Sequence, residues 1–159
     1  LKLSVGMSYS FNNRTSRVAG QLGEYLYNKQ LADIHYYGVD FAMKRKGWSM
    51  TGELYRRTSK NGISINPNDP TKANFVYSGT GFLLQSGYLY NPKNEFSLRY
   101  GLTSPDQSIT AYVSRLNEYM VGYSHYFFRH NLKLQTDAAY FAGPSQEFLQ
   151  WRFTGVVTF

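Results

Sequence analysis

The sequence predicts an all-β protein: a transmembrane, antiparallel up-and-down β-barrel with eight strands in this chain. Three observations support this fold class, and the first is alternation near the C-terminus. From Leu149 to Phe159 every second residue is apolar or small, and the residues between them are mostly polar. Successive side chains of a strand point to opposite faces, so this segment has one apolar and one polar face. Strands that close an outer-membrane barrel carry such an apolar band towards lipid.

The second observation is composition. Aromatic residues make up 18% of the chain, with 15 Tyr and 11 Phe. Tyr and Trp suit the two membrane–water interfaces because one end of the ring is apolar and the other end is polar. The apolar runs are too short for a transmembrane helix, and the chain has no cysteine for a disulfide or a thiolate metal site.

The third observation is the order of the connections. Strands are expected near residues 2–11, 34–44, 48–57, 81–90, 95–101, 118–127, 132–141 and 148–159. Long polar loops are expected at 12–33, 58–79 and 102–117, with a shorter one at 142–147. Short turns are expected at 44–47, 91–94 and 128–131, which are rich in Gly, Asn, Pro and basic residues. Bacterial barrels keep short turns on the periplasmic side. We therefore expect a single domain, residues 1–159, in the outer membrane of a Gram-negative bacterium, with both termini periplasmic.

Each strand is justified by its alternation. In chain order the expected outer sets are Leu3, Val5, Met7, Tyr9 and Phe11; Tyr37, Val39, Phe41 and Met43; Trp48, Met50, Gly52 and Leu54; Leu84, Ser86, Tyr88 and Tyr90; Phe96, Leu98 and Tyr100; Tyr119, Val121 and Tyr123; Leu132, Leu134, Thr136, Ala138 and Tyr140; and the set from Leu149 to Phe159. Of these, Leu3, Val5, Val39, Phe41, Leu98, Val121, Leu134 and Phe153 are predicted to face lipid. A soluble β-sandwich or lipocalin-like barrel also alternates. It would have to bury many Tyr and Trp rings with unpaired polar ends, and its loops are seldom as long as 12–33.

Several segments of the sequence resemble the C-terminal half of the phosphate-selective porin O and P family. They are YYGVDFAMKRKGWSMTGELYRR (36–57), GFLLQSGYLY (81–90), EFSLRYGLTSPD (95–106), EYMVGYSHYFFRHNLKLQTDAAY (118–140) and the closing LQWRFTGVVTF. Members of that family have about twice as many strands. The resemblance implies either the last eight strands of a barrel with 16 or more strands or a complete small barrel, and the sequence leaves both open.

The last strand also resembles the signal read by the outer-membrane barrel assembly machinery. The residues that carry this likeness are the terminal aromatic Phe159 and the apolar Val157, Phe153 and Trp151. The resemblance implies that machinery as a partner, together with outer-membrane lipid and lipopolysaccharide. A homo-oligomer or a larger membrane complex is also compatible with it.

Charged residues collect on the predicted inner face. The basic residues expected to line a pore are Lys2, Arg57, Arg99, Lys133 and Arg152. Unpaired basic side chains attract anions in a wet channel, whereas cross-strand ion pairs are only wall structure. Asp137 falls opposite Arg152 if their hairpin is symmetric. Arg99 faces inward beside Gln85 and Gly87, with no obvious carboxylate partner, so it is the predicted selector.

The predicted function is a porin-like channel for passive diffusion of small polar or anionic solutes, phosphate among them. The alternative is a small closed β-barrel with a structural or accessory role in a larger outer-membrane complex. We expect no enzyme, cofactor or metal, because His35, His125 and His130 are not spaced with other ligands or with a nucleophile. The net charge of +7 comes without a basic array interleaved with stacking aromatics, so no nucleic acid partner is expected.

Overall fold

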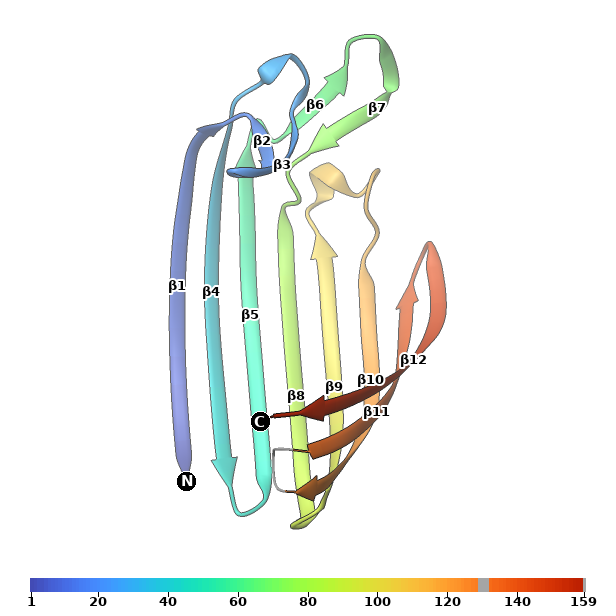
Figure 1. Cartoon of the computed structure of the whole chain (residues 1–159). Helices are drawn as coiled ribbons and strands as arrows, with labels where there is room; N and C mark the ends of the chain where they lie inside the picture. The colour runs from blue at the N-terminus through green and yellow to red at the C-terminus, as the bar shows by residue number, and fades with distance from the viewer. Residues whose placement is uncertain (129–131, 159) are drawn as a thin grey trace.

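The computed structural model describes residues 1–128 and 132–158, and most of them belong to one eight-stranded antiparallel sheet (Figure 1). The strand order is β1-β4-β5-β8-β9-β10-β11-β12. The bounds are β1 Lys2–Thr15, β4 Ala32–Arg45, β5 Trp48–Lys60, β8 Gly79–Asn91, β9 Asn94–Pro105, β10 Leu116–Phe128, β11 Leu132–Gly143 and β12 Gln146–Val157. The prediction of an all-β chain with eight antiparallel strands is therefore confirmed, and each expected strand overlaps one strand of this sheet.

Each long strand pairs with the next long strand along the chain, so the sheet is an up-and-down meander. The sheet is strongly curved, and β11 and β12 swing across its hollow side in Figure 1. Among the described residues β1 and β12 do not pair with one another, so both keep a free edge. Because the strands are even in number and alternate in direction, β12 runs antiparallel to β1. These two edges therefore have the relative direction that an antiparallel seam needs.

The register of the sheet aligns the predicted faces across all eight strands. On one face Gln85 lies opposite Arg99, and Asp137 lies opposite Arg152. On the other face Leu98 lies opposite Val121. Because a slip of one residue would exchange the two faces of a strand, this continuity confirms the alternation in every strand.

The apolar face is exposed to the surroundings. Leu3, Leu98 and Phe153 leave 62%, 63% and 78% of their surface uncovered. Val5, Val39, Val121 and Leu134 are also exposed, while Phe41 is half-buried. The polar face lines the hollows of the sheet instead.

Short turns join β4 to β5 and β8 to β9, as the sequence predicts. Lys46 and Gly47 both have positive φ angles, 47° and 84°, which is the backbone that tight two-residue hairpins require. In the second turn the Asn91 side chain accepts a hydrogen bond from the backbone N–H of Lys93 at 2.9 Å. The third predicted turn includes residues 129–131, which lie outside the described residues.

The long connections contain regular structure, which corrects the expectation of plain loops. Residues 12–33 hold the end of β1, the hairpin β2 (Arg17–Ala19) and β3 (Leu22–Tyr25), and the 3-10 turn η1 (Tyr27–Lys29). Residues 58–79 hold the hairpin β6 (Ile63–Asn66) and β7 (Asp69–Phe75), and 102–117 hold η2 (Gln107–Ile109). The strands also run further than expected, and β9 continues to Pro105 instead of ending at 101. The backbone pairing of a hairpin continues beyond the point where the apolar pattern ends, so periodicity underestimates strand length.

The first two long connections pack together into one unit, which we call the cap (residues 16–31 and 61–78). Its core joins Leu26 and Val76 of the cap to Ala32 and Ile34 at the start of β4, each at most 1% exposed, with Val18 packed against them. Tyr27 donates its backbone N–H to Ser64 Oγ at 2.9 Å, which ties the two connections to one another. Figure 1 shows both hairpins at the end of the sheet away from the N-terminus.

No helix in the described part of the chain is long and apolar enough to span a membrane.

Candidate functional site

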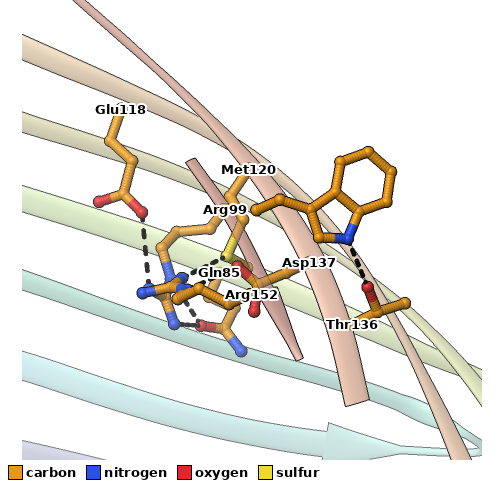
Figure 2. A network of polar contacts seen from close by, with 8 residues as sticks. Gln85, Arg99, Glu118, Met120, Thr136, Asp137 and Arg152 are labelled. Atoms are coloured by element: carbon orange, nitrogen blue, oxygen red, sulfur yellow. Dashed lines mark hydrogen bonds and ion pairs between the residues drawn. The ribbon is translucent and has the colours of Figure 1, made fainter. Parts of the chain in front are cut away.

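The middle of the polar face carries a belt of paired charges (Figure 2). Arg99 on β9 donates hydrogen bonds from Nε and Nη2 to Gln85 Oε1 of β8, at 2.9 and 2.8 Å. Its Nη1 lies 3.6 Å from Glu118 Oε1 of β10. Gln85 on β8 lies directly opposite Arg99. On β10 the residue directly opposite Arg99 is Met120, and Glu118, two residues before Met120, is a diagonal neighbour.

The second pair of the belt joins β11 to β12. Arg152 donates from Nε to Asp137 Oδ1 at 2.7 Å, and its Nη2 lies 3.4 Å from Met120 Sδ. The predicted Asp137–Arg152 pair is therefore confirmed. Figure 2 shows both guanidinium groups reaching into the same space, and Arg99, Asp137 and Arg152 line one hollow of about 310 Å³.

This belt corrects the prediction for Arg99, which was expected to have no carboxylate partner. The carboxylate comes from Glu118 on β10, whereas Gln85 lies on β8, on the other side of β9. Within the belt, two guanidinium groups therefore face two carboxylates, and the local charge is balanced. These side chains are 20–40% exposed, so the cost of taking the charges out of water offsets much of their attraction, and the pairs add little net stability.

The other predicted pore-lining residues lie apart from the belt. Lys2 is exposed near the first short turn and has no ion pair in the described part of the chain. The Lys133 ammonium lies 5.8 Å from the centre of the Tyr126 ring, within cation–π range. Arg57 donates from Nη2 to the backbone oxygen of Val18 at 3.0 Å, so it attaches the cap to the sheet.

Sequence reasoning missed a second hollow, at the cap end of the polar face. It has a volume of about 440 Å³, and we call it the outer hollow. Its lining side chains include Tyr36, Tyr55, Tyr77, Leu83 and Phe141, with the charged groups of Arg57 and Glu118. These side chains come from β4, β5, β8, β10, β11 and the link between β7 and β8.

Glycines make room for the outer hollow. Tyr55 lies opposite Gly81, where an added Cβ would lie 3.0 Å from the Tyr55 ring. Glu118 lies opposite Gly101, where an added Cβ would lie 3.2 Å from Glu118 Oε2. The signal in the sequence was therefore a pair of glycines on adjacent strands of the polar face, beside large aromatic residues.

One hydroxyl of the outer hollow has no partner. The Tyr77 Oη atom is buried and makes no hydrogen bond within the described residues. Burial raises the pKa of the Tyr77 phenol, and the nearby Asp106 carboxylate raises it further. The phenol therefore stays protonated at neutral pH and remains a hydrogen-bond donor.

A third hollow, of about 640 Å³, opens at the end of the sheet where the described short turns lie. Lys2, Lys44, Arg45 and Lys46 line it, opposite the Glu95 carboxylate. None of these four cations forms an ion pair with another described residue, so this rim keeps a positive charge.

The remaining predicted residues have ordinary structural surroundings. Trp151, Phe153 and Val157 lie exposed on the apolar face, while Phe159 lies outside the described residues. His35 stacks on Phe11 at 4.4 Å, and His125 shares a hydrogen bond with Asn94 at 2.7 Å. His130 lies outside the described residues. Residues 1–128 and 132–158 contain no group of three potential metal ligands.

Comparison with known proteins found no matching family model, no matching curated protein and no matching solved structure.

Proposed function

We propose that the chain forms the wall of an outer-membrane β-barrel through which small polar solutes, preferentially anions, diffuse passively. The observation that carries this proposal is the position of the apolar surface. The sheet presents Leu3, Val5, Leu98, Val121 and Phe153 outward, all more than half exposed, while its polar side chains line the hollows. A water-soluble sheet would bury that face, because exposed apolar patches of this extent promote aggregation or association.

Bilayer burial accounts for the arrangement. In hydrocarbon the backbone N–H and C=O groups need partners within the sheet, and the strand ladder supplies them everywhere except at the β1 and β12 edges. Those edges would be closed either by pairing with one another or by further strands. Pairing with one another gives an eight-stranded barrel, whose interior side chains fill. Further strands widen the interior enough for a water channel.

The preference for anions rests on the charge that remains after pairing. The belt is balanced, but Lys2, Lys44, Arg45 and Lys46 have no carboxylate partner among the described residues. The overall charge of +7 has the same sign. A channel with such a mouth attracts anions over a distance of about one Debye length, roughly 10 Å at 0.1 M salt.

Planar-bilayer recording of the purified, refolded chain tests this proposal. We expect ohmic conductance, with a reversal potential in a KCl gradient that indicates a preference for chloride. Replacing Lys2, Lys44 and Lys46 together by Gln should reduce that preference without closing the channel. A folded protein that inserts but does not conduct would contradict the channel and favour the closed barrel with a structural role, for which the paired belt would serve as filling.

A further inference from the structure

The outer hollow has the size and chemistry of a small-molecule site. Its volume of about 440 Å³ falls within the range of such sites, roughly 300–1,000 Å³. Most of its lining is aromatic or aliphatic, with few polar groups, which is also typical of ligand pockets. The hollow at the charged belt, by contrast, has a mostly polar lining.

The aromatic side chains of the outer hollow form one wall. Tyr36 and Tyr55, on neighbouring strands, have ring centres 5.9 Å apart with their planes tilted by 30°. Leu83 and Phe141 contribute further apolar surface from β8 and β11. A planar ring placed against this wall would gain both apolar burial and the favourable offset or tilted ring contacts of aromatic pairs.

The positive charge in the outer hollow comes from Arg57. A guanidinium carries five N–H donors in a planar fork, and Arg57 uses Nη2 for the Val18 backbone oxygen. It forms no ion pair with another described residue. Its remaining donors match the two oxygens of a carboxylate. The Tyr77 phenol adds a buried donor without a partner in the described part of the chain.

The negative charge of Glu118 limits which ligands fit the outer hollow. Glu118 also lines the outer hollow, with a carboxylate that lies 3.6 Å from Arg99 Nη1. A small, strongly hydrated dianion such as phosphate would meet this carboxylate and gain little from the aromatic wall. A singly charged anion with an apolar ring can instead place its charge at Arg57 and its ring against Tyr36 and Tyr55.

We propose that the outer hollow binds small aromatic carboxylates, with Arg57 holding the carboxylate and Tyr36 and Tyr55 contacting the ring. This inference deepens the proposed channel function by naming a solute class, and it rests on that function only for transport. Binding itself requires the folded chain alone.

The test is calorimetric or NMR titration of the refolded full chain in detergent micelles with benzoate as the probe. Benzyl alcohol, which keeps the ring and lacks the charge, and inorganic phosphate serve as comparison ligands. We expect benzoate to bind more tightly than either, and phosphate to displace it poorly. Arg57→Gln should weaken benzoate binding about tenfold and leave benzyl alcohol binding nearly unchanged.

Matched variants separate the contributions. Lys93→Gln removes one positive charge from an exposed position in the turn between β8 and β9, at the opposite end of the sheet, and should leave benzoate binding unchanged. Because Arg57 also attaches the cap, Arg57→Lys keeps the charge and tests the fork geometry, with an expected loss smaller than that of Arg57→Gln. Tyr55→Ser should weaken benzoate and benzyl alcohol alike. The heat-modifiable gel mobility of each variant reports whether it is folded.

Three results would overturn the site: equal binding of benzyl alcohol and benzoate, displacement of benzoate by phosphate at equal concentration, or no effect of Arg57→Gln in a folded protein. Failure of the channel proposal looks different, since benzoate would bind but the bilayer recordings would show no conductance. Conductance without benzoate binding would leave the channel in place and remove this site.

Discussion

At the scale of single residues, the structure changes what the arginines of the polar face can do. Arg99 and Arg152 each face a carboxylate, whereas Arg57 faces a backbone oxygen and an aromatic hollow. A charge that is already paired has less effect on a passing ion than an unpaired one, because the field of the pair falls off faster with distance. In the proposed channel, Arg99 would therefore be a weaker selector than its inward position alone suggests.

Removing the Glu118 carboxylate should leave the positive charge of Arg99 unpaired, so that it acts more strongly on a passing anion. We expect Glu118→Gln to shift the reversal potential of the channel further towards anions, with a change of roughly twofold to fivefold in the permeability ratio. Gln85 would still orient the guanidinium through its two hydrogen bonds. Planar-bilayer recording measures the effect. The control is Glu24→Gln, which makes the same change of charge at an exposed position of the cap. Equal shifts in the two variants would mean that Arg99 does not face the conduction path.

At the scale of elements, the cap is a small folded unit whose core includes the start of β4. Val76 is fully buried against Leu26 and Ile34, so truncating it to Ala should destabilise the cap by about 2 kcal/mol. Because residues 16–31 and 61–78 share that core with the start of β4, hydrogen exchange should speed up in both connections together and stay unchanged in the sheet beyond that end. Ile65→Ala, at a position that is 54% exposed on β6, is the matched control. Faster exchange in only one of the two connections would show that they do not fold as a unit.

The hairpin of β6 and β7 should loosen in acid. The Asp69 carboxylate accepts hydrogen bonds from the Thr71 hydroxyl and backbone N–H, at 2.5 and 3.1 Å, and lies 3.2 Å from Lys72 Nζ. These contacts hold the pKa of Asp69 below its ordinary value of 3.8. The stabilisation is fully present above pH 3.8 and disappears as the pH falls through the lower pKa of the folded state. Hydrogen exchange of residues 69–75 should therefore accelerate in that acidic range, after correction for intrinsic rates. Thr71→Ala removes the largest of the contacts that lower the pKa of Asp69, so it should reduce this pH dependence, and an unchanged dependence would contradict the assignment.

The elements differ in how far sequence predicts them. The long strands follow from alternation because one face is apolar over the whole length of each strand. The strands of the cap have only three to seven residues and pack on each other across the two connections, so no periodic pattern marks them. Gly20 and Gly23, with φ angles of 78° and 85°, are the local sign of the first cap hairpin.

The candidate site also has parts that the sequence predicts and parts that it does not. The Asp137–Arg152 pair spans one tight hairpin, whose symmetry fixes the register. The Arg99–Glu118 pair depends on the register between β9 and β10. The connection between β9 and β10 consists of irregular structure and a 3-10 turn, and it sets this register. The geometry of that connection does not follow from residue types. The outer hollow depends on side chains from six parts of the chain, so it needed the folded sheet.

At the scale of the whole molecule, the two faces of the sheet should differ in what they contact, and adjacent residues offer the sharpest comparison. Leu98 is 63% exposed on the apolar face, whereas its neighbour Ser97 is half-buried on the polar face that lines the hollows. In outer-membrane vesicles we expect Ser97→Cys to react with a water-soluble, membrane-impermeant maleimide and Leu98→Cys to be protected, because a thiol in hydrocarbon meets neither the reagent nor the water that ionises it. After the vesicles are dissolved and the protein is unfolded, both cysteines should react equally. Since the natural chain has no cysteine, the signal comes from the introduced residue alone. Rapid labelling of Leu98→Cys in intact vesicles, with protection of Ser97→Cys, would place the apolar face in water and contradict the membrane-spanning barrel.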